Sequence, residues 1–421
     1  MIKRIKGTQD ILPEATPQWI ALENLIRKTM TLYNFHELRT PIFEQTQLFA
    51  RGIGQLTDIV SKEMYTFLDR GKKQLTLKPE MTAPIMRAYI ENKLYARAPV
   101  NKVFYIAPLF RQENPQAGRL RQFHQFGAET LGSADPLADV EIIDLAMSTF
   151  QLVGLKNINL RINSVGDPQC RAPYKETLKE YMRPHLAEYC EDCQRRYEEN
   201  PLRVLDCKNP TCQQLNQQAP KLNEHLCEAC DAHYARVKET LKLLEIPFTE
   251  DPYLVRGLDY YTRTVFEITS DVLGAQNAIC GGGRYDLLAS ELEGPDTPAV
   301  GFAAGMERLL IAMEQEGIVL QEPPRLDVFI VALGDQAKSQ APRWLKQIRL
   351  SGLSAETDLL GRSIKAQMRE ANRQRARFVL LVGEDELQRK EFSVKLMDRG
   401  EQISVPFDEI VDFLKRQTKQ D

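Results

Sequence analysis

The chain lacks long apolar runs and has almost no net charge. Its 421 residues include 55 lysines and arginines against 58 aspartates and glutamates, which gives a formal net charge of −3. A total charge this small does not predict nucleic-acid binding, so any RNA contact must come from local basic patches. No apolar run reaches the length of a transmembrane helix, and we therefore expect no membrane association.

Secretion signals and a disulfide framework are also absent from the sequence. Residues 1–10 carry charges, but no apolar core follows them, so we expect that they are not a secretory signal. Eight cysteines in so long a chain do not make a disulfide scaffold. No internal repeat or low-complexity tract is present. These features predict a globular protein of the reducing cytoplasm with roughly two to four domains.

Composition and patterning predict a long first domain, residues 1–325, and a second one, residues 326–421. The boundary follows a linker with paired prolines, and strand and helix patterns alternate after it, which predicts a small α/β domain. Residues 170–240 are polar and contain seven of the eight cysteines. We expect them to form a module inserted into the first domain.

Two strand-like segments, residues 104–113 and 122–129, are joined by a polar loop and are the most informative part of the chain. Side chains two apart in a strand share a face. The residues expected to share one face of this hairpin are Arg111, Glu113, Phe123, Gln125, Gly127 and Glu129. An antiparallel hairpin would thus display a cation, two acids, an amide and an aromatic ring on one surface. This set suits a nucleotide and a zwitterion.

This hairpin resembles motif 2 of the class II aminoacyl-tRNA synthetases. The resemblance consists of Phe110-Arg111-x-Glu113 followed by Arg121-Gln-Phe-His-Gln-Phe-Gly127, and the Gln-Phe-His-Gln string is similar to that of histidyl-tRNA synthetases. The alternative is a surface hairpin with solvated charges. Further segments that resemble the same family follow in order along the chain, which favours the family.

Two of these segments resemble signatures peculiar to the histidyl enzymes. Residues 254–267 contain Arg256-Gly-Leu-Asp-Tyr260-Tyr261, and residues 278–286 contain Gly281-Gly-Gly-Arg-Tyr285. Both have strand-like patterns. Three consecutive glycines let the backbone approach a ligand closely, although a lone glycine-rich turn can be purely structural. For Arg256, the alternative role is an ion pair with Asp259 or Glu267.

Three weaker segments complete the series. A helical pattern at residues 17–33, followed by a proline-containing strand pattern, resembles motif 1, which forms the dimer interface in that family. Residues 77–82 resemble the family's Leu-Arg-Pro-Glu-x-Thr segment with Lys78 in place of arginine, and Thr82 is also a candidate helix N-cap. Residues 301–308 resemble motif 3, which would place Arg308 in the first turn of a helix.

The resemblance implies an α+β fold, with a class II antiparallel sheet flanked by helices and a C-terminal α/β anticodon-binding domain. It also implies a homodimer that uses ATP with Mg²⁺ to ligate L-histidine to histidine tRNA through a histidyl-adenylate, releasing AMP and pyrophosphate. The alternative is a non-catalytic regulatory paralogue. Such paralogues lose part of the signatures and the C-terminal domain, whereas Arg256, the triple glycine and residues 326–421 are all present here.

The resemblance also implies roles for the matching residues. Arg111 and Arg256 are expected to hold the α-phosphate and the carboxylate as the catalytic pair. The nucleotide is expected to contact Arg111, Glu113, Phe123 and Arg308. The ammonium group of histidine is expected to bind Glu80, Thr82 and Gln125, and its imidazole Glu129, Tyr261 and Tyr285, with Tyr260 also at the substrate site.

The cysteine module is a candidate metal site. Cys190-x-x-Cys193 and Cys227-x-x-Cys230 are separated by 33 residues, which is typical of zinc ribbons. We expect one structural zinc on these four cysteines, and the alternative is a set of reduced, buried thiols. Cys207 and Cys212 lie between the two pairs, and His225 and His233 are substitute ligands. No histidine signature accompanies these cysteines, so a catalytic thiol is not expected.

Overall fold

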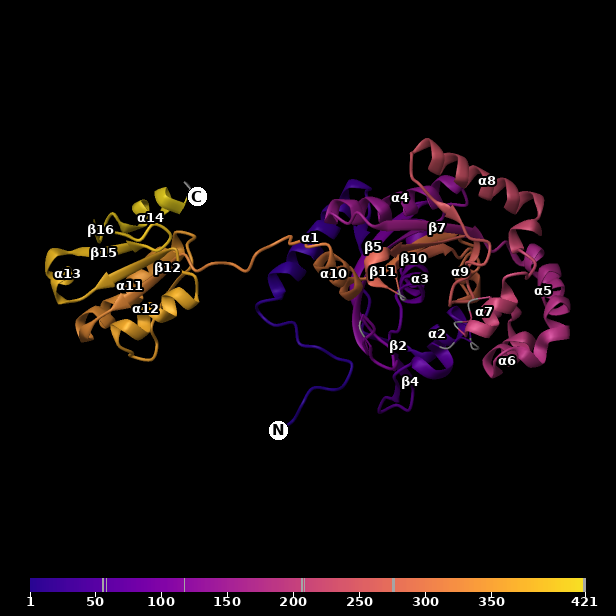
Figure 1. The fold of residues 1–421 in the computed structure, drawn as a ribbon, viewed down its shortest axis with the longest axis horizontal. Coiled ribbons are helices and arrows are strands. Elements are labelled where there is room, and N and C mark those ends of the chain that lie inside the picture. The colour runs from indigo at the N-terminus through magenta and orange to yellow at the C-terminus, as the bar shows by residue number, and fades with distance from the viewer. Residues whose placement is uncertain are drawn as a thin grey trace. The chain divides into compact units, whose positions relative to one another are not determined.

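The computed structural model describes residues 1–54, 57, 59–116, 118–205, 207, 209–274 and 277–418. The chain divides into two compact units, Met1–Gln321 and Glu322–Asp421 (Figure 1). Within the described ranges, no helix has both the length and the apolar character needed to cross a bilayer.

The first unit is built on an eight-stranded sheet with the order β1-β5-β6-β11-β10-β9-β7-β8. Its strands are β1 (His36–Glu37), β5 (Asn101–Phe110), β6 (Gln122–Leu131), β7 (Ile158–Ser164), β8 (Thr249–Glu250), β9 (Thr262–Ser270), β10 (Ala278–Arg284) and β11 (Ala299–Gly305). The six central strands pair antiparallel, and only the edge strands β1 and β8 pair parallel with their neighbours. The predicted hairpin is β5–β6, with Phe110 opposite Gln122.

Four helices cover one face of this sheet (Figure 1). They are α1 (Thr16–Leu32), α4 (Pro136–Val153), α8 (Glu228–Leu243) and α10 (Met306–Gln315). Their apolar side chains pack with Phe126, Phe266 and Phe302 from the strands. Burial of each such side chain stabilises the fold by about 1.5–3 kcal/mol. The helical layer therefore holds the sheet in place, and the other face of the sheet remains available for a site.

The opposite face is covered in part by α3 (Thr82–Glu91), whose Ile85 and Met86 pack on Tyr105 and Leu109 of β5. In β5, Phe104 points to the helical layer while Tyr105 points to the α3 side, as strand alternation requires. Beside it lies a three-stranded sheet, β2 (Phe43–Gln45), β4 (Gln74–Leu77) and β3 (Thr66–Leu68), with the short helices α2 (Thr46–Gly52) and α9 (Leu288–Glu291).

The predicted strand at residues 254–267 is wrong in its first half, because β9 begins at Thr262. The backbone of residues 254–259, just before β9, forms hydrogen bonds with three separate segments and not with a neighbouring strand. Asn163 Nδ2 donates to the Leu254 carbonyl oxygen at 3.0 Å, and the Arg203 guanidinium donates to the Gly257 carbonyl oxygen. The Asp259 N–H donates to the Ile53 carbonyl oxygen at 3.2 Å.

The cysteine-rich region is helical and lies between β7 and β8. Its helices are α5 (Pro168–Met182), α6 (Glu191–Glu199), α7 (Pro210–Asn216) and the start of α8, with short 3₁₀ turns at Arg183–Glu188, Pro201–Val204 and Leu222–Glu224. Tyr174, Leu178, Tyr189 and Leu222 belong to its own small core.

The second unit is a five-stranded sheet with the order β13-β12-β14-β15-β16 and helices on both faces. Its elements are β12 (Val328–Ala332), α11 (Gly334–Leu350), β13 (Ala355–Thr357), α12 (Ile364–Arg373), β14 (Phe378–Val382), α13 (Glu384–Arg389), β15 (Glu391–Leu396), β16 (Glu401–Pro406) and α14 (Ile410–Thr418). In β12, Val328 and Ile330 enter one core while Phe329 and Val331 enter the other. Burial on both faces explains the continuous apolar run at this strand.

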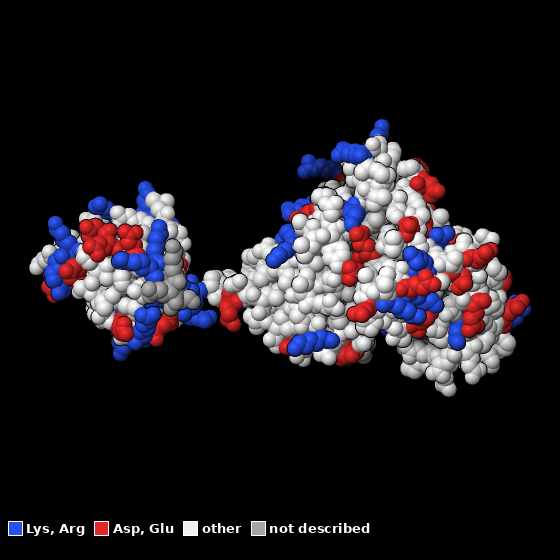
Figure 2. Space-filling view, turned by 90° about the horizontal axis from the view of Figure 1, so that it is seen from above, with Lys and Arg blue, Asp and Glu red and all other residues white. Residues whose placement is uncertain are grey.

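Charged side chains of both signs are intermingled on the surface. On the face shown in Figure 2, lysines and arginines lie next to aspartates and glutamates over both units. This mixture agrees with the net charge of −3 and with local, rather than face-wide, basic patches.

Candidate active site

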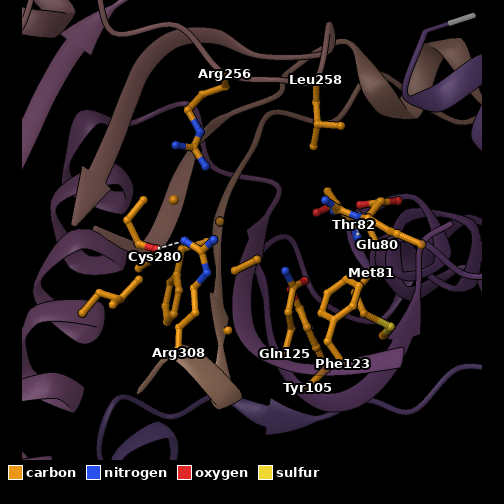
Figure 3. Close-up of a pocket in the computed structure, with 18 of the residues that line it drawn as sticks. Glu80, Met81, Thr82, Tyr105, Phe123, Gln125, Arg256, Leu258, Cys280 and Arg308 are labelled. Atoms are coloured by element: carbon orange, nitrogen blue, oxygen red, sulfur yellow. Dashed lines mark hydrogen bonds between the residues drawn. The ribbon is translucent and has the colours of Figure 1, made fainter. Parts of the chain in front are cut away.

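A pocket lies on the face of the large sheet opposite the helical layer, between the hairpin β5–β6, strands β10 and β11, and the segment before β9 (Figure 3). All twelve residues to which the sequence assigned catalytic, substrate or nucleotide roles line it: Glu80, Thr82, Arg111, Glu113, Phe123, Gln125, Glu129, Arg256, Tyr260, Tyr261, Tyr285 and Arg308. Arg256 and Arg308 enter from one side and face Glu80 and Thr82 on the other (Figure 3). The pocket therefore has a cationic wall and an acidic wall.

Glu129 is the most deeply buried acid of the pocket, with only 1% of its surface exposed. Its two carboxyl oxygens accept hydrogen bonds from the Thr82 hydroxyl at 3.1 Å and the Tyr285 hydroxyl at 2.5 Å. Burial raises the pKa of Glu129 to about 8; these two donors oppose the rise, while nearby Glu80 adds to it. A cation or a further N–H donor bound here would stabilise the charged form.

Glu80 caps helix α3, so the alternative in which Thr82 is the N-cap is wrong. The Glu80 carboxylate accepts from the backbone N–H groups of Thr82 at 2.7 Å and Ala83 at 2.9 Å. The Thr82 hydroxyl is thereby left to bind Glu129. Burial raises the pKa of Glu80, and the two backbone donors and Arg111 oppose this rise. Two buried acids on one wall favour a bound ammonium group.

Arg111 lies against the ring of Phe123. Its guanidinium carbon is 5.4 Å from the ring centroid, and its Nε donates to the Pro79 carbonyl oxygen at 2.9 Å. Glu113 lies 3.7 Å from Arg111 and 3.5 Å from Arg119. A guanidinium and an aromatic ring both offer flat faces on which a purine base can stack.

Arg256 forms the ion pair that the sequence suggested as its alternative role. Its Nη1 donates to Glu267 Oε2 at 2.8 Å. Asp259, the other suggested partner, instead accepts from Asn200 at 2.9 Å and lies 3.5 Å from Arg203. Arg256 nevertheless lines the pocket, so the ion pair with Glu267 orients a guanidinium that faces the site.

Glycines make room for these charged groups. Gly301 pairs with Glu129 between β11 and β6, and a Cβ there would lie 1.5 Å from a Glu129 carboxyl oxygen. A Cβ at Gly281 would lie 1.6 Å from Arg256 Nη2, and one at Gly282 would lie 2.5 Å from the Phe266 ring. The triple glycine was expected to bring backbone close to a ligand. Gly281 does line the pocket, but both glycines also accommodate the protein's own side chains.

Arg308 lies in the first turn of α10, as predicted. Its Nη1 donates to the Ala278 carbonyl oxygen at 2.7 Å and its Nε to the Gly118 carbonyl oxygen at 3.2 Å. Burial lowers the pKa of Arg308, and the charge of nearby Arg119 adds to this effect. A guanidinium in the first turn of a helix, with a second guanidinium near it, forms an environment for a phosphate.

Comparisons with known proteins agree with this geometry. The family described as histidyl-tRNA synthetase matches residues 7–309, and the family described as anticodon binding domain matches residues 327–417. The chain belongs to the histidyl-tRNA synthetase family. The predicted resemblance is thus confirmed, and so is the predicted class II α+β fold with a C-terminal α/β anticodon-binding domain.

Similar proteins of about the same length support the assignment of the chain to this family. The chain is 50% identical over 419 residues to the histidine–tRNA ligase of Moorella thermoacetica, covering 99% of this chain and 98% of that protein. It is 47% identical over 425 residues to that of Desulfitobacterium hafniense, covering 100% and 99%. The crystal structure of apo S. aureus histidyl-tRNA synthetase is similar with a TM-score of 0.84 and 42% identity, covering 99% of this chain and 100% of that one.

Some pocket residues were missed by the prediction. Tyr105 lines the pocket from β5 and is 1% exposed. The predicted strand at 104–113 groups it with Arg111 and Glu113 by alternation, although β5 ends at Phe110 and these two charged residues follow it. Glu307 of the histidyl-family motif 3 accepts from the His124 N–H at 3.0 Å and lies 2.9 Å from its ring Nδ1. Lys78 is buried outside the pocket lining, with its Nζ 3.3 Å from the Thr40 hydroxyl.

The predicted zinc site on Cys190, Cys193, Cys227 and Cys230 is wrong, because the two Cys-x-x-Cys pairs belong to different clusters. Cys190 and Cys193 lie with Cys207 and Cys212, while Cys227 and Cys230 lie with Asp167 and Cys170. Among the residues that the structure describes, neither cluster includes His225 or His233. His233 instead lies 3.1 Å from Asp139.

Proposed function

We propose that this chain ligates L-histidine to histidine tRNA in two steps, using ATP and releasing AMP and pyrophosphate. One observation supports this most strongly. Residues from motif 2, motif 3 and both histidyl signatures line a single pocket. The chain also matches histidine–tRNA ligases over almost their whole length.

In the first step, a carboxylate oxygen of histidine attacks the α-phosphorus of ATP. The bond from that phosphorus to the bridging oxygen breaks, and pyrophosphate leaves. A carboxylate is already deprotonated, so no general base is required, and catalysis depends on positioning and charge stabilisation. We assign this task to Arg111 and Arg256, whose guanidinium groups line the pocket.

The acidic wall of the pocket is suited to histidine itself. The ammonium group would donate to Glu80, Thr82 and Gln125, which line the same pocket. An ammonium group has three donors and no acceptor, so a carboxylate, a hydroxyl and an amide oxygen match it.

The imidazole would bind Glu129, with the Tyr261 and Tyr285 phenols beside it. The Tyr260 ring contacts both of these rings, at centroid distances of 4.7 and 5.6 Å, and Tyr260 also lines the pocket. Burial raises the pKa of Glu129 to about 8, and a hydrogen bond from a bound imidazole N–H would lower this pKa by stabilising the carboxylate.

The opposite end suits ATP. The adenine would stack on the Phe123 ring and bind Glu113, and the γ-phosphate would lie at Arg308. Among the described residues, only the two cysteine-containing clusters gather three or more potential metal ligands. Magnesium would therefore enter with ATP, held mainly by phosphate oxygens and water, as is usual for this ion.

In the second step, the terminal ribose hydroxyl of the tRNA attacks the adenylate carbonyl and AMP leaves. We assign anticodon binding to the second unit, where Arg369, Arg373 and Arg375 are exposed around the end of α12. Arg373 lies 2.5 Å from Glu370, so only part of this basic charge is compensated within the helix.

We also propose that the chain acts as a homodimer in the cytoplasm. Exposed apolar side chains on the three-stranded sheet support the dimer: Phe43 is 51% exposed and Phe67 is 44% exposed, and their ring centroids are 6.4 Å apart. Adjacent exposed apolar groups of this kind mark interaction surfaces. They include part of the segment that resembles motif 1.

Histidine-dependent exchange of labelled pyrophosphate into ATP, followed by charging of histidine tRNA, tests the proposed function. We expect both activities. A chain ending near Pro323 should keep the exchange but charge tRNA much more slowly. Absence of exchange by the full chain would favour the regulatory paralogue, and equal charging by the shortened chain would contradict the anticodon assignment.

A further inference from the structure

We propose that the cysteine-rich module binds two structural zinc ions. Site A consists of Cys190, Cys193, Cys207 and Cys212. Site B consists of Asp167, Cys170, Cys227 and Cys230. In each site the four candidate ligand atoms lie within 4.8 Å of one another, and together the sites use every cysteine of the chain except Cys280.

Site A joins two helix starts and one loop. Cys190 is the N-cap of α6 and Cys193 lies in its first turn, while Cys212 lies in the first turn of α7. The sulfur atoms of Cys190 and Cys207 are 3.8 Å apart. A tetrahedral zinc with Zn–S bonds of about 2.3 Å places two sulfur ligands about 3.8 Å apart.

Site B repeats this construction with two longer helices. Asp167 is the N-cap of α5 and Cys170 lies in its first turn; Cys227 is the N-cap of α8 and Cys230 lies in its first turn. Asp167 binds the Cys170 N–H through one oxygen at 3.1 Å, and its other oxygen lies 3.8 Å from the Cys227 sulfur. One aspartate oxygen thus remains directed at the three sulfurs.

Backbone donors already point at the sulfur atoms. In site A, the Cys190 N–H donates to Cys212 Sγ at 3.3 Å and the Asn209 N–H donates to Cys207 Sγ at 3.5 Å. In site B, the Cys227 N–H donates to Cys170 Sγ at 3.0 Å. Such bonds stabilise thiolates, which are the form that binds metal, and second-shell donors of this kind accompany metal ligands.

Three cysteines with one aspartate, and four cysteines, are ligand sets that zinc accepts in closed structural sites. Disulfides do not account for the grouping, because all these cysteines are free and each cluster brings more than two ligand atoms together. Helices α6 and α7 of the module are short, and its core also includes Val265 of β9. Metal ligation stabilises small modules of this kind by linking segments that pack little surface.

Both sites adjoin the segment that lines the active-site pocket. From the end of α6, Asn200 donates to Asp259 at 2.9 Å, and Arg203 binds the Gly257 carbonyl oxygen. Next to Cys170, Arg171 donates to the Tyr261 carbonyl oxygen at 2.9 Å. Zinc in the two sites would thus brace residues 257–261 from two directions.

The test is the zinc content of the full chain, purified without chelator from zinc-supplemented cells and measured by plasma mass spectrometry and native mass spectrometry. We expect two zinc ions per chain. Cys212→Ser and Cys170→Ser should each remove one, and the double variant should remove both. Cys280→Ser is the matched control, because Cys280 lies in β10 outside both clusters, and it should keep two.

A second measurement needs no variant. Metal-depleted wild-type chain titrated with Co²⁺ should develop thiolate-to-cobalt absorption that saturates at two equivalents. Depletion should also lower the melting temperature and raise the Michaelis constant for histidine several-fold more than that for ATP. Zero or one zinc per chain, or cobalt absorption that saturates at one equivalent or never develops, would overturn the proposal. The metal count is independent of the proposed ligase activity.

Discussion

The pocket and the cysteine module lie in the same unit, yet the sequence predicted them with different success. All twelve pocket residues that the sequence named lie together in the structure. The two Cys-x-x-Cys pairs were correctly recognised as pairs, but they were assigned to each other and in fact have other partners. Strand alternation explains why Phe123, Gln125 and Glu129 share a face, and the resemblance to the class II synthetases placed the remaining pocket residues with them. The spacing within Cys-x-x-Cys indicates only that two thiols share one helix start, so it could not predict which pairs meet.

A second difference concerns charge. In the pocket, the charged side chains have partners within the protein: Arg256 pairs with Glu267, and Glu129 accepts hydrogen bonds from two hydroxyl groups. In the module, clustered thiols have backbone donors but no cation among the described residues of their clusters. The pocket thus suits exchangeable substrates, and the module suits a resident metal.

Among the changes that test the role of the pocket, Arg256→Ala should have the largest effect on the rate of adenylate formation. If Arg256 stabilises charge that develops at the α-phosphate, its removal should slow single-turnover adenylate formation by about 10²–10³, as loss of one preorganised donor does. Transfer from a pre-formed adenylate should suffer less. Rapid-quench measurement of adenylate in the variant provides the number.

Glu267→Gln is the matched control for this prediction, because it removes the ion-pair partner and leaves the guanidinium. It should affect the rate less than Arg256→Ala. If Arg256→Ala lowers the melting temperature while adenylation stays within a few-fold of wild type, the arginine is only an ion-pair partner.

The second effect is on histidine selection. Glu129→Ala leaves the imidazole without its buried acceptor, and an unpaired buried polar group costs about 1–3 kcal/mol. The Michaelis constant for histidine should therefore rise roughly 5- to 150-fold, while that for ATP changes little. Steady-state pyrophosphate exchange measures both constants. Equal increases for the two substrates would indicate a structural role instead.

Gly281→Ala should have a smaller effect that sharpens the assignment of Arg256. The new Cβ would lie 1.6 Å from Arg256 Nη2, so the guanidinium must move while its charge remains. Adenylation should slow to a rate between those of wild type and Arg256→Ala. Combined with Arg256→Ala, the glycine change should add little, because the group that it displaces is gone. Full additivity in this double-mutant cycle would contradict the link.

The last effect concerns the pH dependence of stability through Glu129. Its pKa rises from the usual 4.5 to about 8 on folding, so the folded chain favours the protonated form. The corresponding stabilisation is fully present below pH 4.5 and is lost as the pH rises towards 8. The glutamine side chain of Glu129→Gln is neutral at every pH. The melting temperature of this variant should therefore rise relative to that of the wild type as the pH increases. If the melting temperatures of the variant and the wild type change with pH by the same amount from about pH 5 to about pH 8.5, the prediction is wrong.

The sequence by itself determined the local features of the protein. Strand alternation and the motif strings identified the hairpin face and the position of Arg308 in the first turn of α10. These features depend on residues close together in the chain, where side-chain periodicity fixes the geometry.

Only the tertiary structure decided the rest. It decided that residues 254–261 bond to three other segments and are not a strand, and that Glu80 rather than Thr82 caps α3. It also decided that Cys190 meets Cys207 while Cys227 meets Asp167. Each of the longer contacts joins segments that the chain could bring together in several ways. Which arrangement forms depends on the packing of whole helices and strands, and this packing leaves no local pattern in the sequence.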